Sequence, residues 1–358
     1  GLVGSEMCIR DSTCVVNFGD DSKCLGEVVG GIEHQGIRQM FHMMNAARIG
    51  VGIQGLSVAA ASYLSALEYA RERKQGASAK QFKDANAPRV PILDHPNIRR
   101  DLLGMKARVE GVRALVMKLS NHTDRLNATR GKDDESEAYH KGQIDLLTPL
   151  VKAYGTDTAF EVSSLAIQVH GGHGYLRDHP VEQYCRDSKI FQIYEGTNFI
   201  QSMDLVSRKL GQAGGANTQA FLSDIQTFIM ENKDTPELQD SIKHLQAAHE
   251  AVAASVMQFI SWFKGGKIEH IPLAAEQFLR ILSELSVGWL LLDQAAISLR
   301  KLPETSESHP DHAFYTGKKF AALYFANNVL TTLPSRVQRL SEIDTLPVEI
   351  PDEAFATV

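Results

Sequence analysis

Residues 168–198 read QVHGGHGYLRDHPVEQYCRDSKIFQIYEGTN and break a helical pattern twice, first at a glycine cluster and then at Glu195-Gly196-Thr197. The packing of helices against each other does not require so many backbone interruptions in so short a stretch. Glycine adopts positive φ readily and lets a ligand approach the backbone closely. The segment therefore indicates a binding site set into a mainly helical fold.

Upstream of this stretch, apolar residues recur every three or four positions, which is the period of an amphipathic helix. Gly50, Gly52 and Gly55 lie inside the first helical pattern, where they lower helix stability but permit close approach of another backbone. The charged segment 127–141 is expected to form a loop or a frayed helix end. Together with the stretch above, the pattern predicts helices over 37–73, 98–119, 147–169, 180–192 and 198–210.

Downstream, the segment GQAGGANTQ (211–219) has the composition of a linker. Further helical patterns follow over about 218–232, 236–263, 272–300 and 309–341, and residues 342–358 are predicted to form a tail. Trp262 and Trp289 fall on apolar faces and are expected in the core. The predicted organisation is a four-helix, up-down bundle over 32–210 and an accessory helical domain over 220–341.

The beginning of the chain has a different character. Residues 13–18 (TCVVNF) and 24–29 (CLGEVV) are rich in β-formers and flank the turn-forming GDDSK. They predict one β-hairpin, and two strands alone are marginally stable in water. Residues 1–12 (GLVGSEMCIRDS) show no period and resemble a translated adapter sequence, so they are expected to be foreign to the protein, or disordered, with a genuine flexible end as the alternative.

Composition excludes several classes of protein. The 358 residues carry a net charge of −6, which disfavours broad nucleic-acid binding. No uninterrupted apolar run reaches the roughly 18 residues of a membrane span. The four cysteines include no Cys-x-x-Cys pair, which suits a reducing compartment.

Glu195 follows the apolar run Ile190–Tyr194, where its carboxylate would be partly desolvated. Desolvation makes a carboxylate a stronger base toward a carbon acid. The backbone amides freed by the break could stabilise a developing oxyanion. The alternative is a solvent-facing Glu with no role in catalysis, and residue types alone favour that alternative.

A metal site is a second interpretation of the same segment. His170, His173, His179 and Cys185 are close in sequence, but their spacing matches no common zinc pattern. One Glu-x-x-His pair, Glu137 and His140, lacks the second pair of a di-iron bundle. The prediction is that the chain holds no metal, with a metal-binding bundle kept as an alternative.

Four segments in this order and spacing resemble the acyl-CoA dehydrogenase family: MFHMMNAARIGVGIQG (40–55), YARERKQG (69–76), QVHGGHGY (168–175) and RDSKIFQIYEGTNFIQ (186–201). The helical extension resembles a large branch with an extra C-terminal helical domain, which includes 3-methylmercaptopropionyl-CoA dehydrogenases. The resemblance implies a C-terminal fragment in which 13–31 is the end of a middle β-domain.

By this resemblance the activity is FAD-dependent α,β-dehydrogenation of an acyl-CoA to a trans-2-enoyl-CoA, with Glu195 as the catalytic base. It implies that Arg48, Tyr194 and Gly196 bind substrate. The resemblance also implies a set of residues that bind FAD, several of which would contact the FAD held by a neighbouring subunit. They are Arg73, Gln75, Gln168, Gly171, Gly172 and Thr197.

The implied partners are an acyl-CoA, a second copy of the chain and an electron-transfer flavoprotein. A bacterial cytoplasmic location is expected, with the mitochondrial matrix as the alternative. The chain by itself is expected to be inactive, because much of the flavin and acyl pocket of the family lies in domains upstream. A non-catalytic helical scaffold is the remaining alternative function.

Overall fold

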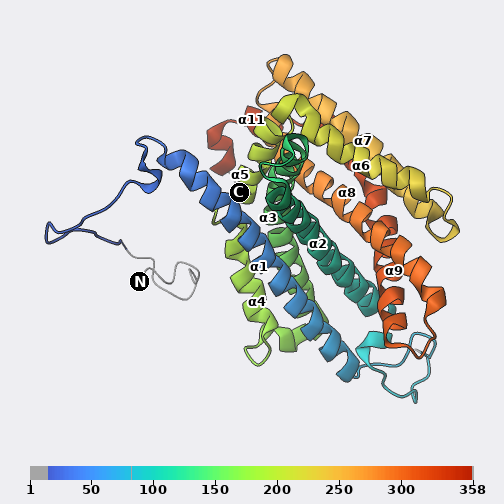
Figure 1. Cartoon of the computed structure of the whole chain (residues 1–358). Helices are drawn as coiled ribbons and strands as arrows, with labels where there is room; N and C mark the ends of the chain where they lie inside the picture. Colours follow the sequence, from blue (N-terminus) through green and yellow to red (C-terminus); the bar gives the residue numbers. More distant parts are fainter. Residues whose placement is uncertain (1–14, 82, 357–358) are drawn as a thin grey trace.

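Helix α3 (Asp134–His170) is the centre of the structure, a computed structural model that describes residues 15–81 and 83–356. Helices α1 (Gly36–Glu72) and α2 (Pro96–Thr129) pack along α3 and against each other (Figure 1). The remaining α-helices are α4 (Val181–Ser188), α5 (Asn198–Asp204), α6 (Ala216–Asn232), α7 (Gln239–Lys264), α8 (His270–Lys301), α9 (Pro310–Asn328), α10 (Leu333–Ser341) and α11 (Leu346–Glu349). The described residues contain no β-strand, so the mainly α prediction is confirmed.

The predicted β-hairpin over 13–31 is wrong for the part that the structure describes; residues 13 and 14 lie outside it. Ser22 N donates to Gly19 O at 2.8 Å, so the turn forms where it was predicted. The flanking segments do not pair as strands, and Val15 and Leu25 are 89% and 98% exposed. Two short strands have no further surface to pack on here, and a lone hairpin is marginally stable in water.

Two predicted helix boundaries also need correction. The segment 127–141 is largely helical: α2 runs to Thr129 and α3 begins at Asp134, because the Asp133 side chain caps α3 by accepting from Ser136 N at 3.0 Å. The single pattern over 309–341 divides at Val329 into α9 and α10. Pro334 lies in the first turn of α10, where a missing N–H is tolerated, whereas a helix interior would be broken there.

Two glycines of α1 allow α1 and α3 to approach at backbone distance. A Cβ added at Gly52 would lie 2.7 Å from Val151 O, and one added at Gly55 would lie 2.6 Å from Gly155 O. At Gly50 an added Cβ meets nothing within 4 Å. The expected close backbone approach therefore occurs at two of the three glycines.

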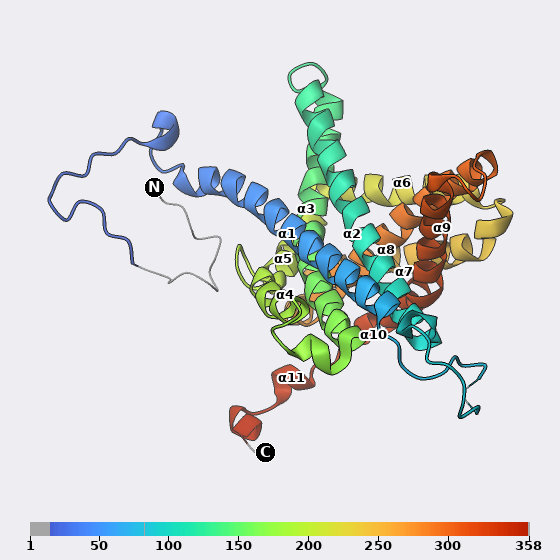
Figure 2. The same ribbon diagram turned by 90° about the horizontal axis from the view of Figure 1, so that it is seen from below.

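The accessory helices pack on the side of α2 and α3 away from α1 (Figures 1 and 2). One apolar core runs through both parts of the chain and includes Leu115 of α2, Leu150 of α3 and Leu285 of α8. A Cβ added at Gly111 of α2 would lie 2.3 Å from Val287 Cγ1 of α8, which shows how closely these helices pack. Trp262 and Trp289 are buried, as predicted.

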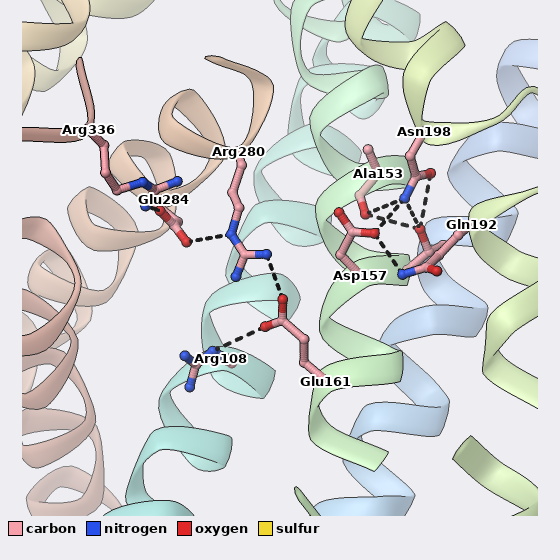
Figure 3. Close-up of polar contacts among 10 residues, drawn as sticks. Arg108, Ala153, Asp157, Glu161, Gln192, Asn198, Arg280, Glu284 and Arg336 are labelled. Atoms are coloured by element: carbon pink, nitrogen blue, oxygen red, sulfur yellow. Dashed lines mark hydrogen bonds and ion pairs between the residues drawn. The ribbon is translucent and has the colours of Figure 1, made fainter. Parts of the chain in front are cut away.

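A row of charged side chains crosses this boundary between the two parts (Figure 3). Glu161 of α3 pairs with Arg108 of α2 at 3.7 Å and with Arg280 of α8 at 2.6 Å. Arg280 also donates to Glu284 at 3.1 Å, and Glu284 pairs with Arg336 of α10. Glu284 is buried, so its negative charge depends on these two arginines.

Two described helices are long and apolar enough to cross a bilayer by length and composition, within Gln39–Glu72 and His270–Glu304. In α8 the apolar window is 83% buried inside the protein, as in the core helix of a globular domain. In α1 the corresponding share is 39%, and its buried side faces α3. The core accounts for the apolar character of α8.

The close contact between α1 and α3 predicts opposite effects of the same substitution at nearby positions. Gly55→Ala should lower the free energy of unfolding by about 1–3 kcal/mol, because the added methyl group overlaps a backbone carbonyl. Gly50→Ala should raise it by up to about 1 kcal/mol, because Ala favours the helix and has room there. Urea unfolding of both variants checks this; equal effects would contradict the packing described.

The buried carboxylate of Glu284 gives a second prediction. Glu284→Ala should lower the free energy of unfolding by about 3–5 kcal/mol, because Arg280 and Arg336 lose a buried partner. Glu304→Ala is the matched control: it removes an exposed pair with Lys301 and should cost less than about 1 kcal/mol. Similar losses of stability in the two variants would show that the row of charges does not contribute in this way.

Candidate active site

Glu195 occupies a backbone turn between the 3-10 helix η5 (Lys189–Gln192) and α5. Its φ is +55°, in the left-handed region that non-glycine residues rarely adopt, and Gly196 follows at +84°. The side chain is half-buried, and no hydrogen bond or ion pair joins it to another described residue. None of the hydrogen bonds found within 15–81 and 83–356 uses the amide N–H of Glu195 or Gly196. A carboxylate and two amides are thus available in one turn.

On one side, the turn rests on α1. Tyr194 donates its hydroxyl hydrogen to Gln54 Oε1. A Cβ added at Gly196 would lie 3.6 Å from Arg48 Nη2 and 2.9 Å from Gln201 Nε2, and the positive φ at this point favours glycine. Three residues assigned to the substrate by resemblance, Arg48, Tyr194 and Gly196, therefore lie around Glu195.

Arg48 is 4% exposed and paired with Asp204 of α5 at 3.4 Å. Asp204 also accepts from Arg208 at 2.6 Å. The Nε of Arg48 is buried and has no partner among the described residues. An unpartnered buried donor beside the turn is a position where a ligand oxygen would satisfy the guanidinium.

On the other side, the turn is fastened to α3 (Figure 3). Asp157 Oδ1 accepts from Gln192 Nε2 at 2.9 Å, just before the turn, and from Asn198 Nδ2 at 2.7 Å, just after it. Asn198 Oδ1 accepts from Lys152 Nζ at 2.9 Å. We call Lys152, Asp157, Gln192 and Asn198 the α3 clasp. The clasp holds both ends of the segment that carries Glu195.

Lys152 is fully buried, and burial is the main reason that its pKa falls to about 8. The carboxylates of Asp157 and Glu195 oppose this fall in pKa, and the positive charge of Arg48 adds to it. Burial likewise raises the pKa of Asp157, while the hydrogen bond from Asn198 acts in the opposite direction. The interior face of the turn is thus a dry environment in which charges interact strongly.

A second location brings together most of the residues assigned to FAD. A cavity of about 710 Å³ lies where α1 ends and α3 ends. Arg73, which caps the end of α1, is exposed there, and no atom would contact a Cβ at Gly171 or Gly172. The predicted cofactor residues that line this cavity are Arg73, Gln75, Gln168, Gly171 and Gly172.

Thr197 is the exception among the predicted cofactor residues. Its hydroxyl caps α5 by accepting from Ile200 N at 3.2 Å, and it lies next to Glu195 rather than at the cavity. Arg48, beside the turn, and Glu72, beside the cavity, are separated along α1 by about 36 Å at the helical rise. One chain therefore carries two separate groups of candidate residues.

Three of the four residues of the alternative metal site come together around Tyr69. The Tyr69 ring stacks on His170 at 4.4 Å and contacts His179 at 5.6 Å, and its hydroxyl lies 3.0 Å from His173 Nδ1. His170 Nδ1 donates to Ala166 O at 2.8 Å. In the part of the chain that the structure describes, no group of three His, Cys, Asp or Glu side chains is arranged to hold a metal ion.

The clasp residues Lys152, Asp157 and Asn198, and the α1 contact Gln54, were not singled out from the sequence. Lys152 offered one signal: it follows Val151 inside the apolar stripe of the third predicted helix, where a charged residue needs a buried partner. Nothing in the local pattern indicated which partner, because Asn198 lies 46 residues away.

Two protein families match the chain. The family described as "Acyl-CoA dehydrogenase, C-terminal domain" matches residues 34–210, and that described as "Acetyl-CoA dehydrogenase C-terminal like" matches 221–351. The two matched ranges lie on either side of the glycine-rich segment 211–219.

Curated relatives match almost the whole chain. A butyryl-CoA dehydrogenase of Syntrophomonas wolfei is 33% identical over 96% of this chain and 56% of that protein. The broad-specificity linear acyl-CoA dehydrogenase FadE5 of Mycobacterium tuberculosis is 33% identical over 96% of this chain and 57% of that protein. A 3-methylmercaptopropionyl-CoA dehydrogenase of Ruegeria pomeroyi is 34% identical over 87% and 51%. The chain thus spans about half the length of the curated relatives it matches.

Among solved structures, the chain resembles an acyl-CoA dehydrogenase of Bacillus anthracis complexed with FAD, with a TM-score of 0.65 and 20% identity. That similarity covers 89% of this chain and 52% of the other. At this identity the likeness concerns the fold. The two family matches and the curated relatives show that the chain belongs to the acyl-CoA dehydrogenase family.

Proposed function

We propose that this chain is the catalytic C-terminal part of an FAD-dependent acyl-CoA dehydrogenase that converts an acyl-CoA to a trans-2-enoyl-CoA. The observation that carries the proposal is the turn at Glu195, which presents a half-buried carboxylate and two free backbone amides side by side. Similarity to curated acyl-CoA dehydrogenases over 96% of the chain supports it.

Glu195 is the base of the proposed reaction. A thioester acidifies the hydrogen on its α-carbon, and a fixed carboxylate within reach can take that hydrogen as a proton. The left-handed backbone at Glu195 and Gly196 fixes the direction in which the carboxylate points. The amide of Glu195 would donate to the thioester oxygen and stabilise the negative charge that develops there.

FAD suits the residues that line the cavity at the end of α1. Arg73 supplies an exposed cation for a phosphate, and Gly171 and Gly172 leave the backbone open to a bulky ligand. Thr197, beside Glu195, would contact the phosphate side of a flavin bound at the turn. When bound, FAD supplies the two-electron acceptor for the hydrogen that leaves the β-carbon as hydride.

The separation of the two groups supports an assembly of at least two copies. The turn of one copy and the cavity residues of its partner would then complete one flavin site, so each copy would contribute to two sites. An electron-transfer flavoprotein is the proposed acceptor of the electrons, and one relative is described as the subunit CarC of a caffeyl-CoA reductase-Etf complex from Acetobacterium woodii. The proposed location is the bacterial cytoplasm.

The role of Glu195 predicts the effect of a minimal change. In the FAD-loaded enzyme that contains this chain, Glu195→Gln should lower the rate of acyl-CoA-dependent dye reduction by about 10²–10⁴-fold, because an amide cannot accept the proton. The thermal unfolding midpoint should stay unchanged, since no described residue bonds to this side chain. Glu237→Gln, at an exposed position of the accessory domain, should retain full activity. Full activity of Glu195→Gln would refute the assignment.

The role of Arg73 predicts weaker flavin binding. Arg73→Ala should reduce the affinity for FAD by about 10–100-fold, because one hydrogen bond to a charged group contributes about 1.5–3 kcal/mol. Equilibrium titration of the protein with FAD, followed by flavin fluorescence, measures the change. Lys74→Ala is the control, since Lys74 is an adjacent exposed cation that does not line the cavity. Equal losses in the two variants would indicate a general charge effect instead of a phosphate contact.

A further inference from the structure

We propose that Lys152 is a positioning residue for Glu195, acting through Asn198 and the rest of the α3 clasp; this rests on the proposed function of Glu195. The inference stands on the geometry of the clasp, on the complete burial of the lysine and on the attraction between its positive charge and the carboxylate of Glu195.

The contacts of Asn198 give the first step. Its Oδ1 accepts from Lys152 Nζ at 2.9 Å, and its Nδ2 donates to Asp157 Oδ1 at 2.7 Å. An amide side chain can be turned end for end, but Lys152 can only donate and the ionised Asp157 can only accept. The lysine and the aspartate together therefore allow one orientation of Asn198, the first residue of α5.

The second step concerns the far end of the turn. Asp157 Oδ1 also accepts from Gln192 Nε2 at 2.9 Å, so one carboxylate oxygen holds the residues on both sides of 193–197. Helix α3 fixes the position of Asp157, which lies about one helical turn after Ala153. The Ala153 carbonyl also accepts from Asn198 Nδ2, at 3.3 Å. The distance between the two ends of the turn is thus set by α3.

The third step links the clasp to the conformation of Glu195. A non-glycine residue with φ of +55° persists only where its surroundings hold it. Glu195 itself makes no hydrogen bond to another described residue that could do so. On the α1 side, Tyr194 of the turn donates a hydrogen bond to Gln54. On the α3 side, the clasp holds the residues before and after the turn. Gly196 O also accepts from Gln201 Nε2 at 3.2 Å, so loss of the clasp should loosen the backbone that directs the carboxylate without unfolding the turn.

Lys152 also affects Glu195 through charge. The charged groups that interact with Lys152 are Asp157 on α3, Arg48 on α1 and Glu195 itself. Lys152 is fully buried, so water screens these interactions weakly. The buried ammonium of Lys152 therefore attracts the Glu195 carboxylate toward the clasp.

The experiment compares three variants of the FAD-loaded enzyme. Lys152→Met keeps an unbranched side chain of nearly the same length and removes both the charge and the donor. Lys152→Arg keeps the charge. Lys209→Met is the control, because Lys209 is another nearly buried lysine with one carboxylate partner, Asp145 at 3.0 Å, away from the turn. The measurements are hydrogen exchange of segment 193–200 by mass spectrometry, and the kinetic constants kcat and KM.

In Lys152→Met we expect faster exchange over 193–200 with unchanged exchange in α7, and a kcat lower by about 10²-fold, the loss typical of a misplaced catalytic group. We also expect KM to stay unchanged, so that the loss appears in kcat alone. Lys152→Arg, which keeps the charge and a donor, should recover most of the lost kcat, and Lys209→Met should match the parent in exchange over 193–200, in kcat and in KM.

Unchanged exchange over 193–200 in Lys152→Met, or a kcat equal to that of the parent in the same variant, would overturn the proposal. If Lys152→Met does not fold, Asn198→Ala removes the same contacts from the other partner, and unchanged exchange there has the same meaning. A parent enzyme that dehydrogenates no acyl-CoA would refute the proposed function, whereas the exchange result would still decide whether Lys152 holds the turn.

Discussion

The structure depends on the burial of α3 between α1, α2 and the accessory helices. An α-helix with helices packed on every side must provide a small or apolar surface wherever a neighbour comes close. In α3, Val151 and Gly155 provide it where Gly52 and Gly55 of α1 pack against them. The polar residues that α3 retains in this environment must find partners within the protein. Lys152, Asp157 and Glu161 find them on three different elements: Asn198 of α5 and Gln192 of η5 on one side, and Arg280 of α8 on the other.

The same requirement ties the accessory helices to the candidate active site. Glu161 lies one helical turn after Asp157 on α3. Glu161 pairs with Arg280, from which the ionic row continues to Arg336 (Figure 3). Asp157 holds the two ends of the Glu195 turn. Helix α5, which begins at Asn198, also packs on α8. The second helical part thus shares a core and a charged boundary with the first, and it supports the face of α3 that the turn rests on.

Helix positions were the most predictable part of the fold. Apolar residues spaced three and four apart located α1 within one residue of its observed ends, because burial of one stripe dictates that spacing. The errors occurred where that signal is absent or misleading. The charged segment 127–141 was expected to form a loop or a frayed helix end, yet most of it is helical because Asp133 caps α3 locally. The β-rich segment near the beginning was expected to pair, but strand pairing needs a surface to cover it, and none is provided by the described residues.

By itself, the sequence determined the helical class, the break at Glu195-Gly196-Thr197 and the resemblance to acyl-CoA dehydrogenases, since each follows from local period or from motifs in order. Only the tertiary structure decided that Arg48 is buried against Asp204 and that Thr197 lies apart from the other predicted cofactor residues. It alone brought Lys152, Asp157 and Asn198 together behind the turn. The physical reason is that these contacts join residues 41 to 156 positions apart, and side-chain period within one helix carries no information about the partner across such a separation.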